Sequence, residues 1–65
     1  MTVIINGEQH PTTAGTILDL LMHLKIDPRR VAVELNMDIL PKDAYESTSL
    51  QDGDRIEIVH FVGGG

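Results

Sequence analysis

Apolar and polar residues follow different periods in different parts of the chain. Near the start, a β-branched run at residues 3–5 leads into Asn6 and Gly7. An Asn-Gly pair between extended residues is a strong signal for a tight β-hairpin. The pattern therefore predicts a strand, a turn and a second strand across residues 2–11.

The next segment changes to a helical period. Its apolar residues recur at spacings of three and four, so they share one face of an amphipathic helix of about ten residues. That face is the candidate core contact of the helix. The residues on it are Ile17, Leu20, Leu21 and Leu24.

The ends of this helix also have sequence signals. Thr16 stands where an N-cap belongs, and Asp19 completes a capping-box-like pair that suits the positive end of the helix dipole. Asp27 and Pro28 follow the apolar run. Since proline disfavours an α conformation at the residue before it, this pair is expected to end the helix.

Residues 31–35 return to a period of two, which predicts a half-buried strand that closes at Asn36. Ala32 and Glu34 would then point away from the core. The following stretch, residues 38–50, reads as irregular, with Pro41 as a breaker and a short helical turn near residues 43–46.

The last segment alternates again after a turn at Asp52 and Gly53. A strand here would expose the apolar side chains of Val59 and Phe61, which is unusual for a strand of a small domain. The alternation places Ile56, Ile58 and His60 towards the core, and Arg55, Glu57, Val59 and Phe61 towards solvent.

The order of elements is hairpin, helix, strand, irregular crossing and final strand. A helix with one apolar stripe must bury it against a sheet face, which gives an α+β class with two layers. A right-handed connection would make the first and last strands parallel neighbours. We therefore expect a β-grasp (ubiquitin-like) fold, with a mixed sheet of about four to five strands on one main helix. Residues 1–65 would form a single domain with a flexible glycine tail at residues 63–65.

The charge and the apolar runs of the chain indicate its partners and its location. Ten acidic and five basic residues give a net charge of −5, so a nucleic acid is an unsuitable partner and a basic protein surface a suitable one. The chain has no apolar run long enough to span a membrane and no signal-peptide pattern, which predicts a cytoplasmic protein.

The chain shows no pattern of catalytic residues. It contains no cysteine, and no Gly-rich phosphate loop or nucleophile triad can be traced in it. Its histidines, His10, His23 and His60, fall on different predicted elements, which argues against a metal site. We therefore expect a protein that is not an enzyme and binds no cofactor of its own.

Three stretches carry a resemblance to a known family: "INGE" near the start, "DPRRVAVELN" in the middle and "DGDRIEIVHFVGGG" at the end. Together they resemble the ThiS family, the sulfur carriers of thiamine biosynthesis, over essentially the whole chain. The resemblance implies a β-grasp protein whose last carboxylate becomes a thiocarboxylate. That sulfur would then be donated to build the thiazole ring.

The resemblance also implies partners and a modified residue. Gly65 matches the family's modified terminus, Gly64 its paired glycine and Gly63 the preceding flexible position. An E1-like adenylyltransferase of the ThiF type would activate the carboxylate with ATP and Mg. A persulfide donor would supply sulfur, and a thiazole synthase of the ThiG type would receive it.

The residues before the glycines are candidates for partner binding. Phe61 and Val62 correspond to the apolar lead-in of the tail, and Val59 and Phe61 with nearby Ala32 would form an apolar patch on the helix-free sheet face. One position departs from the expected pattern. Met37 follows Asn36 where a glycine would suit a positive-φ turn.

Two other functions share these features. A molybdopterin-synthase small subunit or a ubiquitin-like modifier would have the same fold and the same Gly-Gly end. A non-covalent β-grasp interaction module, in which the glycines are inert, is the alternative from another class. The whole-chain resemblance and the length of 65 residues favour the thiamine carrier.

Overall fold

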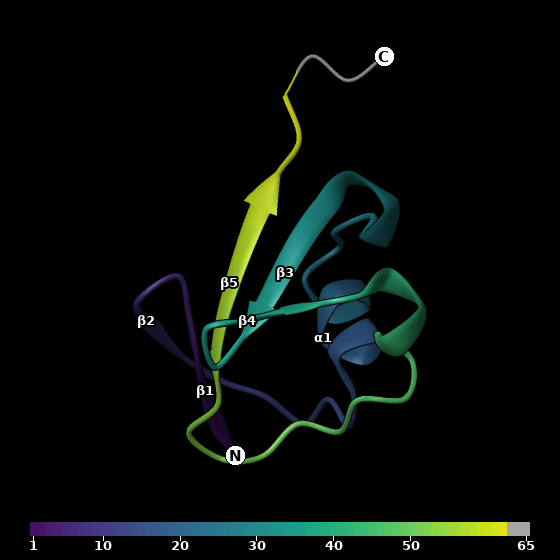
Figure 1. Cartoon of the computed structure of the whole chain (residues 1–65). Helices are drawn as coiled ribbons and strands as arrows, with labels where there is room; N and C mark the ends of the chain where they lie inside the picture. The colour runs from purple at the N-terminus through teal and green to yellow at the C-terminus, as the bar shows by residue number, and fades with distance from the viewer. Residues whose placement is uncertain (63–65) are drawn as a thin grey trace.

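A mixed β-sheet forms the frame of the molecule in the computed structural model, which describes residues 1–62 (Figure 1). The central strand β5 (Arg55–His60) lies between β1 (Thr2–Ile5) and β3 (Val31–Leu35), and β2 (Glu8–Pro11) and β4 (Asp38–Leu40) form the two edges. β5 runs parallel to β1 and antiparallel to β3, and both outer pairs are antiparallel.

One face of this sheet is covered by α1 (Ile17–His23). The apolar stripe of α1 packs against the inward-facing strand residues, and Tyr45 and Leu50 from the long connection close the same core. This arrangement confirms the predicted α+β class and the β-grasp (ubiquitin-like) fold. No helix within residues 1–62 has the length and apolar character needed to cross a membrane. The side chains with the least exposure are Val3, Ile17, Leu20, Leu21, Val31, Val33 and Ile56.

Helix α1 begins as the sequence predicts. The backbone N–H of Asp19 donates to Oγ1 of Thr16 at 3.1 Å, which satisfies one of the amides that a helix start leaves unpaired. Asp19 also places a carboxylate in the first turn, where the helix dipole favours a negative charge.

The predicted end of α1 is wrong, because the helix stops before residues 27–28. Lys25 adopts a φ of 59°, and its N–H donates to the carbonyl of Met22 at 3.0 Å. The N–H of Ile26 donates to the carbonyl of Leu21 at 2.9 Å. These two bonds are those of a Schellman motif, which closes a helix around a left-handed residue. Lysine gives no sequence signal for that conformation, so the helix is shorter than predicted.

Two short 3₁₀ helices connect the larger elements. In η1 (Pro28–Arg30), a carboxylate oxygen of Asp27 accepts from the backbone N–H of Arg29 at 2.9 Å. The Asp-Pro pair therefore starts a helical turn rather than ending α1. η2 (Lys42–Ala44) follows β4 and lies close to the turn predicted near residues 43–46.

The stretch predicted as irregular contains the edge strand β4 (Asp38–Leu40). A two-residue turn joins β3 to β4, with φ values of 51° at Asn36 and 75° at Met37. Asparagine tolerates this left-handed region, whereas methionine rarely enters it. The left-handed turn therefore forms, although methionine occupies the position that glycine would suit.

Asn6 and Asn36 tie the two hairpin turns to the central strand. The side chain of Asn6 accepts from the backbone N–H of Ile58 at 2.8 Å and donates to the carbonyl of Ile58 at 3.2 Å. Asn36 Oδ1 accepts from the N–H of Arg55 at 3.0 Å. Each amide thus acts as an added peptide group that extends the pairing of β5 beyond the neighbouring strands.

One predicted core residue is exposed. His60 shares the alternation of Ile56 and Ile58, which are buried, but its own side chain lies in solvent. It is the last residue of β5, whose end projects past α1 (Figure 1). The alternation is correct, but the helix does not extend far enough to cover its final position.

We predict that Met37→Gly stabilises the protein. A left-handed non-glycine residue costs about 1–2 kcal/mol, and the greater freedom of glycine in the unfolded chain offsets about 0.5–1 kcal/mol of the gain. Urea unfolding should therefore show a rise of about 0.5–1 kcal/mol in the free energy of unfolding. Gly53→Ala, at a φ of 85°, is the control and should lower it. If Met37→Gly is no more stable than the wild type, the left-handed conformation of Met37 does not destabilise the fold.

Candidate functional site

The chain leaves the sheet at the end of β5. The backbone N–H of Phe61 donates to the carbonyl of Arg30 at 2.9 Å. The side chain of Phe61 is 55% exposed and that of Val62 is 95% exposed. The apolar lead-in predicted from the sequence therefore lies at the surface.

The glycines of the predicted tail, Gly63, Gly64 and Gly65, lie outside the described residues. The predicted modification of Gly65 and the roles of the other two stay predictions. The structure places the two residues before them, Phe61 and Val62, at the point where the chain leaves the sheet.

The helix-free face of the sheet carries apolar side chains. Val59, 57% exposed, lies directly opposite Ala32 on β3, and directly opposed residues project to the same face. Ile39 on β4 is 79% exposed and shares that face, because it lies opposite Glu34, two residues along the strand from Ala32. The predicted juxtaposition of Val59 and Ala32 is present, and their role in partner binding stays a prediction.

Two carboxylates occupy the same face between these apolar residues. Glu34 and Glu57 are direct cross-strand partners on β3 and β5, and like charges in this position repel. Neither carboxylate forms an ion pair with another side chain of residues 1–62. This face, formed by Ala32, Glu34, Ile39, Glu57 and Val59, is called the open face below.

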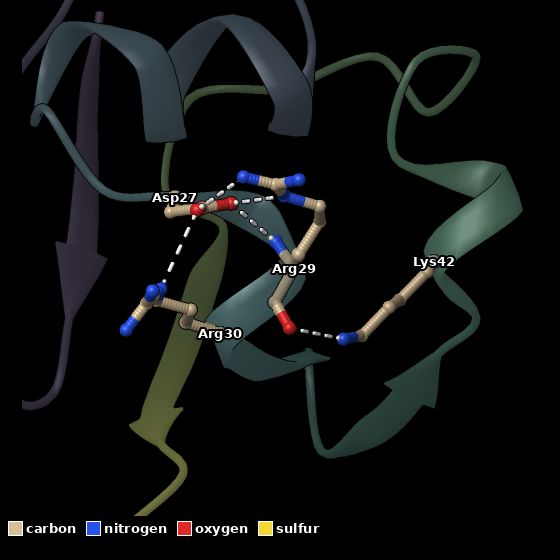
Figure 2. Close-up of polar contacts among 4 residues, drawn as sticks. All are labelled: Asp27, Arg29, Arg30 and Lys42. Atoms are coloured by element: carbon tan, nitrogen blue, oxygen red, sulfur yellow. Dashed lines mark hydrogen bonds and ion pairs between the residues drawn. The ribbon is translucent and has the colours of Figure 1, made fainter. Parts of the chain in front are cut away.

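A second polar cluster surrounds η1 (Figure 2). The carboxylate of Asp27 accepts from Arg29 Nε at 3.1 Å and from Arg29 Nη2 at 3.0 Å. Arg30 Nε lies 3.5 Å from the same group. The hydrogen bonds from Arg29 lower the pKa of Asp27 from 3.8 to about 2, because they favour the charged form.

Lys42 joins this cluster to the chain exit. Its ammonium nitrogen donates to the backbone carbonyl of Arg29 at 2.9 Å (Figure 2), and it lies 4.9 Å from the centroid of the Phe61 ring. No local sequence pattern predicts this contact, because it brings together two residues that are far apart along the chain.

The three histidines lie on different elements of the fold. His10 is on β2, His23 is on α1 and His60 ends β5. His10 and His23 both line an open cavity of about 510 Å³ that Met1 also borders. Even so, residues 1–62 contain no group of three or more His, Cys, Asp or Glu side chains placed to hold a metal ion. The site that the structure supports is therefore the chain exit with the open face beside it.

The fold and the exposed exit of the central strand define a protein of the ubiquitin-like β-grasp class. The chain belongs to the ThiS family, whose model matches residues 3–65. The crystal structure of the thiamine biosynthesis protein (ThiS) from Geobacter metallireducens superposes with a TM-score of 0.85 at 33% identity, over 100% of both chains.

Curated relatives agree with this assignment. The sulfur carrier protein ThiS of Bacillus subtilis strain 168 is 51% identical over 51 residues, which are 78% of this chain and 77% of the relative. The thiazole synthase of Paramagnetospirillum magneticum is 47% identical over 66 residues, and the match covers 100% of this chain. A thiazole synthase of Magnetococcus marinus matches to the same extent. The chain spans only 20% of the length of these two thiazole synthases.

We predict a pH-dependent effect of Asp27→Asn. Asparagine keeps an oxygen that can accept from the backbone N–H of Arg29 but loses the charge. Because the pKa of Asp27 is lowered in the folded state, its carboxylate stabilises the fold above its ordinary pKa of 3.8, and this contribution is lost as the pH falls to about 2. The variant should therefore melt at a lower temperature than the wild type near neutral pH.

The difference in melting temperature should shrink as the pH falls through that range. Asp38→Asn is a matched control, since Asp38 is an exposed carboxylate without an ion pair among the described residues. A difference between wild type and Asp27→Asn that stays constant with pH would show that charge is not the cause.

Proposed function

We propose that this protein is a sulfur carrier of thiamine biosynthesis whose Gly65 carboxylate is converted to a thiocarboxylate. The observation that supports the proposal is the match to the ThiS family over residues 3–65, which includes all three terminal glycines. The likeness to the B. subtilis sulfur carrier protein ThiS supports the same function.

The proposed reaction begins with activation of the carboxylate. A carboxylate is a poor electrophile, so an E1-like adenylyltransferase of the ThiF type would use ATP and Mg to convert it to an acyl-adenylate and release pyrophosphate. A persulfide sulfur would then attack the carbonyl carbon and displace AMP. A thiol would cleave the resulting acyl disulfide, which releases the thiocarboxylate and leaves a new disulfide on the donor.

In this scheme the carrier supplies a substrate group and its partners supply the catalysts. Glycines carry no Cβ, so Gly63, Gly64 and Gly65 suit a narrow enzyme channel. The strand that precedes them is held in the sheet, because its start pairs with β1 and residues 56–60 pair with β3. A fixed base reduces the conformational entropy that must be lost when the tail enters a partner's active site.

The proposed acceptor of the sulfur is a thiazole synthase of the ThiG type. In Paramagnetospirillum and Magnetococcus, one thiazole synthase chain contains a segment that aligns with the whole of this protein. A carrier-like segment and a thiazole synthase thus occur together in one polypeptide. This supports a working association between the two when they are separate chains.

We place the docking of these partners on the open face and the chain exit. Val59 and Ala32 supply apolar area on the open face, and Phe61 and Val62 expose apolar side chains at the chain exit. Glu34 and Glu57 place two carboxylates, neither in an ion pair among residues 1–62, in the same face. A partner with an apolar centre and a basic side chain would therefore match it, and opposite charges would speed their encounter.

The proposed function predicts a change in the mass of the protein after sulfur loading. Incubation with ATP, Mg, the cognate adenylyltransferase and a persulfide donor should exchange one oxygen for sulfur at Gly65. Intact mass spectrometry should show that exchange, and fragmentation should place it on the last residue. A variant that lacks Gly64 and Gly65 should fold with an unchanged melting temperature and gain no sulfur.

Two outcomes would contradict the proposal: one excludes any carrier function, and the other excludes only the role in thiamine biosynthesis. The first is an unchanged mass under conditions in which the adenylyltransferase activates another carrier. The second is rescue of a molybdenum-cofactor-deficient strain without rescue of a thiamine auxotroph, which would assign the protein to molybdopterin synthesis instead.

A second prediction separates stability from binding on the open face. Glu57→Gln removes a like-charge contact with Glu34, so the free energy of unfolding should rise by about 0.2 to 0.5 kcal/mol. The same change should slow association with the thiazole synthase and weaken the salt dependence of the association rate. Stopped-flow binding at several salt concentrations would measure both effects.

Glu46→Gln is the matched control, because Glu46 is exposed and belongs to neither a strand nor the open face. Glu46→Gln changes the net charge by the same amount as Glu57→Gln and should leave the association rate close to that of the wild type. Equal slowing by both variants would show that net charge acts without a local contact at Glu57.

A further inference from the structure

Lys42 reaches across the fold to the base of the tail. It lies on η2, after the edge strand β4. Its ammonium nitrogen is 4.9 Å from the centroid of the Phe61 ring, within the range in which a cation is attracted to an aromatic face. η2, which follows the edge strand β4, thus contacts the residue that follows the central strand β5.

The same ammonium group is fixed by a second contact. It donates to the backbone carbonyl of Arg29 at 2.9 Å (Figure 2), and the next carbonyl, that of Arg30, accepts from the N–H of Phe61 at 2.9 Å. Adjacent carbonyls of η1 therefore bind Lys42 and Phe61 together. We call this arrangement, Lys42 and Phe61 on the carbonyls of Arg29 and Arg30, the exit latch.

Asp27 keeps the base of the latch in place. Its carboxylate binds both the backbone N–H and the guanidinium of Arg29, so η1 presents its carbonyls in one arrangement. The ionised form of Asp27 is favoured, because hydrogen bonds from Arg29 lower the pKa of that carboxyl to about 2. The latch thus rests on a turn that is braced by charged hydrogen bonds.

The latch holds the residue that directly follows β5. Phe61 is only 55% exposed, whereas the next residue, Val62, is 95% exposed. Phe61 is therefore the last described residue whose side chain is held by the rest of the protein. Its backbone bond and its ring contact together fix the course of the chain as it leaves β5.

From this geometry we infer that Lys42 is a positioning residue for sulfur loading. It holds Phe61 so that the tail leaves the domain in the direction in which an activating enzyme receives it. The inference rests on the proposed carrier function. Lys42 takes no part in the chemistry at Gly65 and acts only through Phe61.

A double-mutant cycle tests this role. Lys42→Met keeps most of the length of the side chain without the charge, and Phe61→Leu keeps apolar area without the ring. Each change should lower kcat/KM for adenylation by about two- to fivefold, the effect of losing an exposed cation–aromatic contact. The double variant should be no slower than the slower single variant, because both changes break the same contact.

Conservative variants and a spectroscopic readout separate positioning from a general loss of structure. Lys42→Arg and Phe61→Tyr keep a cation over a ring, so each should retain most of the wild-type kcat/KM. In the free protein, Lys42→Met should shift the NMR signals of the Phe61 ring and amide. The amides of the β1–β2 hairpin should stay unchanged.

The outcomes distinguish this inference from the proposed function. If Lys42→Met is adenylated as fast as the wild type, or if the two single effects multiply in the double variant, the positioning role is overturned and the carrier function stands. Unchanged Phe61 signals in Lys42→Met would overturn the latch itself. If the wild type is not adenylated at all, the carrier function and the positioning role both fail.

Discussion

The pairing of β5 on both of its sides is the constraint on which the rest of the structure depends. Because β1 and β5 run parallel, the chain between them must cross the sheet, and this crossing carries α1 and its apolar stripe onto one face. The amides of Asn6 and Asn36 then add bonds to the backbone of β5. The strand that leads to the tail is therefore held by neighbouring strands and by two side-chain amides, and its exit is held by β3 and by the bond from Phe61 N–H to the carbonyl of Arg30.

Most of the fold could be predicted from local signals. The Asn-Gly hairpin, the Thr16 cap and the alternation of β3 and β5 each depend on a few neighbouring residues, and all were correct. The exposure of His60 was missed because alternation shows which face a strand residue takes and not how far the helix covers that face. The other errors arose where a residue adopts a conformation that its type disfavours. Lys25 and Met37 both have a positive φ, so the end of α1 and the turn into β4 lacked the glycine that would have marked them.

The candidate site was predictable only in part, for a different reason. The outward direction of Val59 and Phe61 follows from the alternation of one strand. The contact of Lys42 with Phe61 and the opposition of Glu34 to Glu57 depend on the register and on the path of the chain between strands. Such contacts have no local signature, because neither residue of a pair changes the sequence pattern around the other.

The edges of the sheet limit how this protein can associate with other chains. Each edge strand is short, with four residues in β2 and three in β4. Pro11 ends the first and Pro41 follows the second, and proline cannot donate a backbone hydrogen bond. Both edges are thus poor templates for another strand, which protects against edge-to-edge aggregation. If the protein acts as the proposed carrier, it would expose an apolar face and still leave each enzyme without breaking a shared sheet, because neither edge favours strand addition.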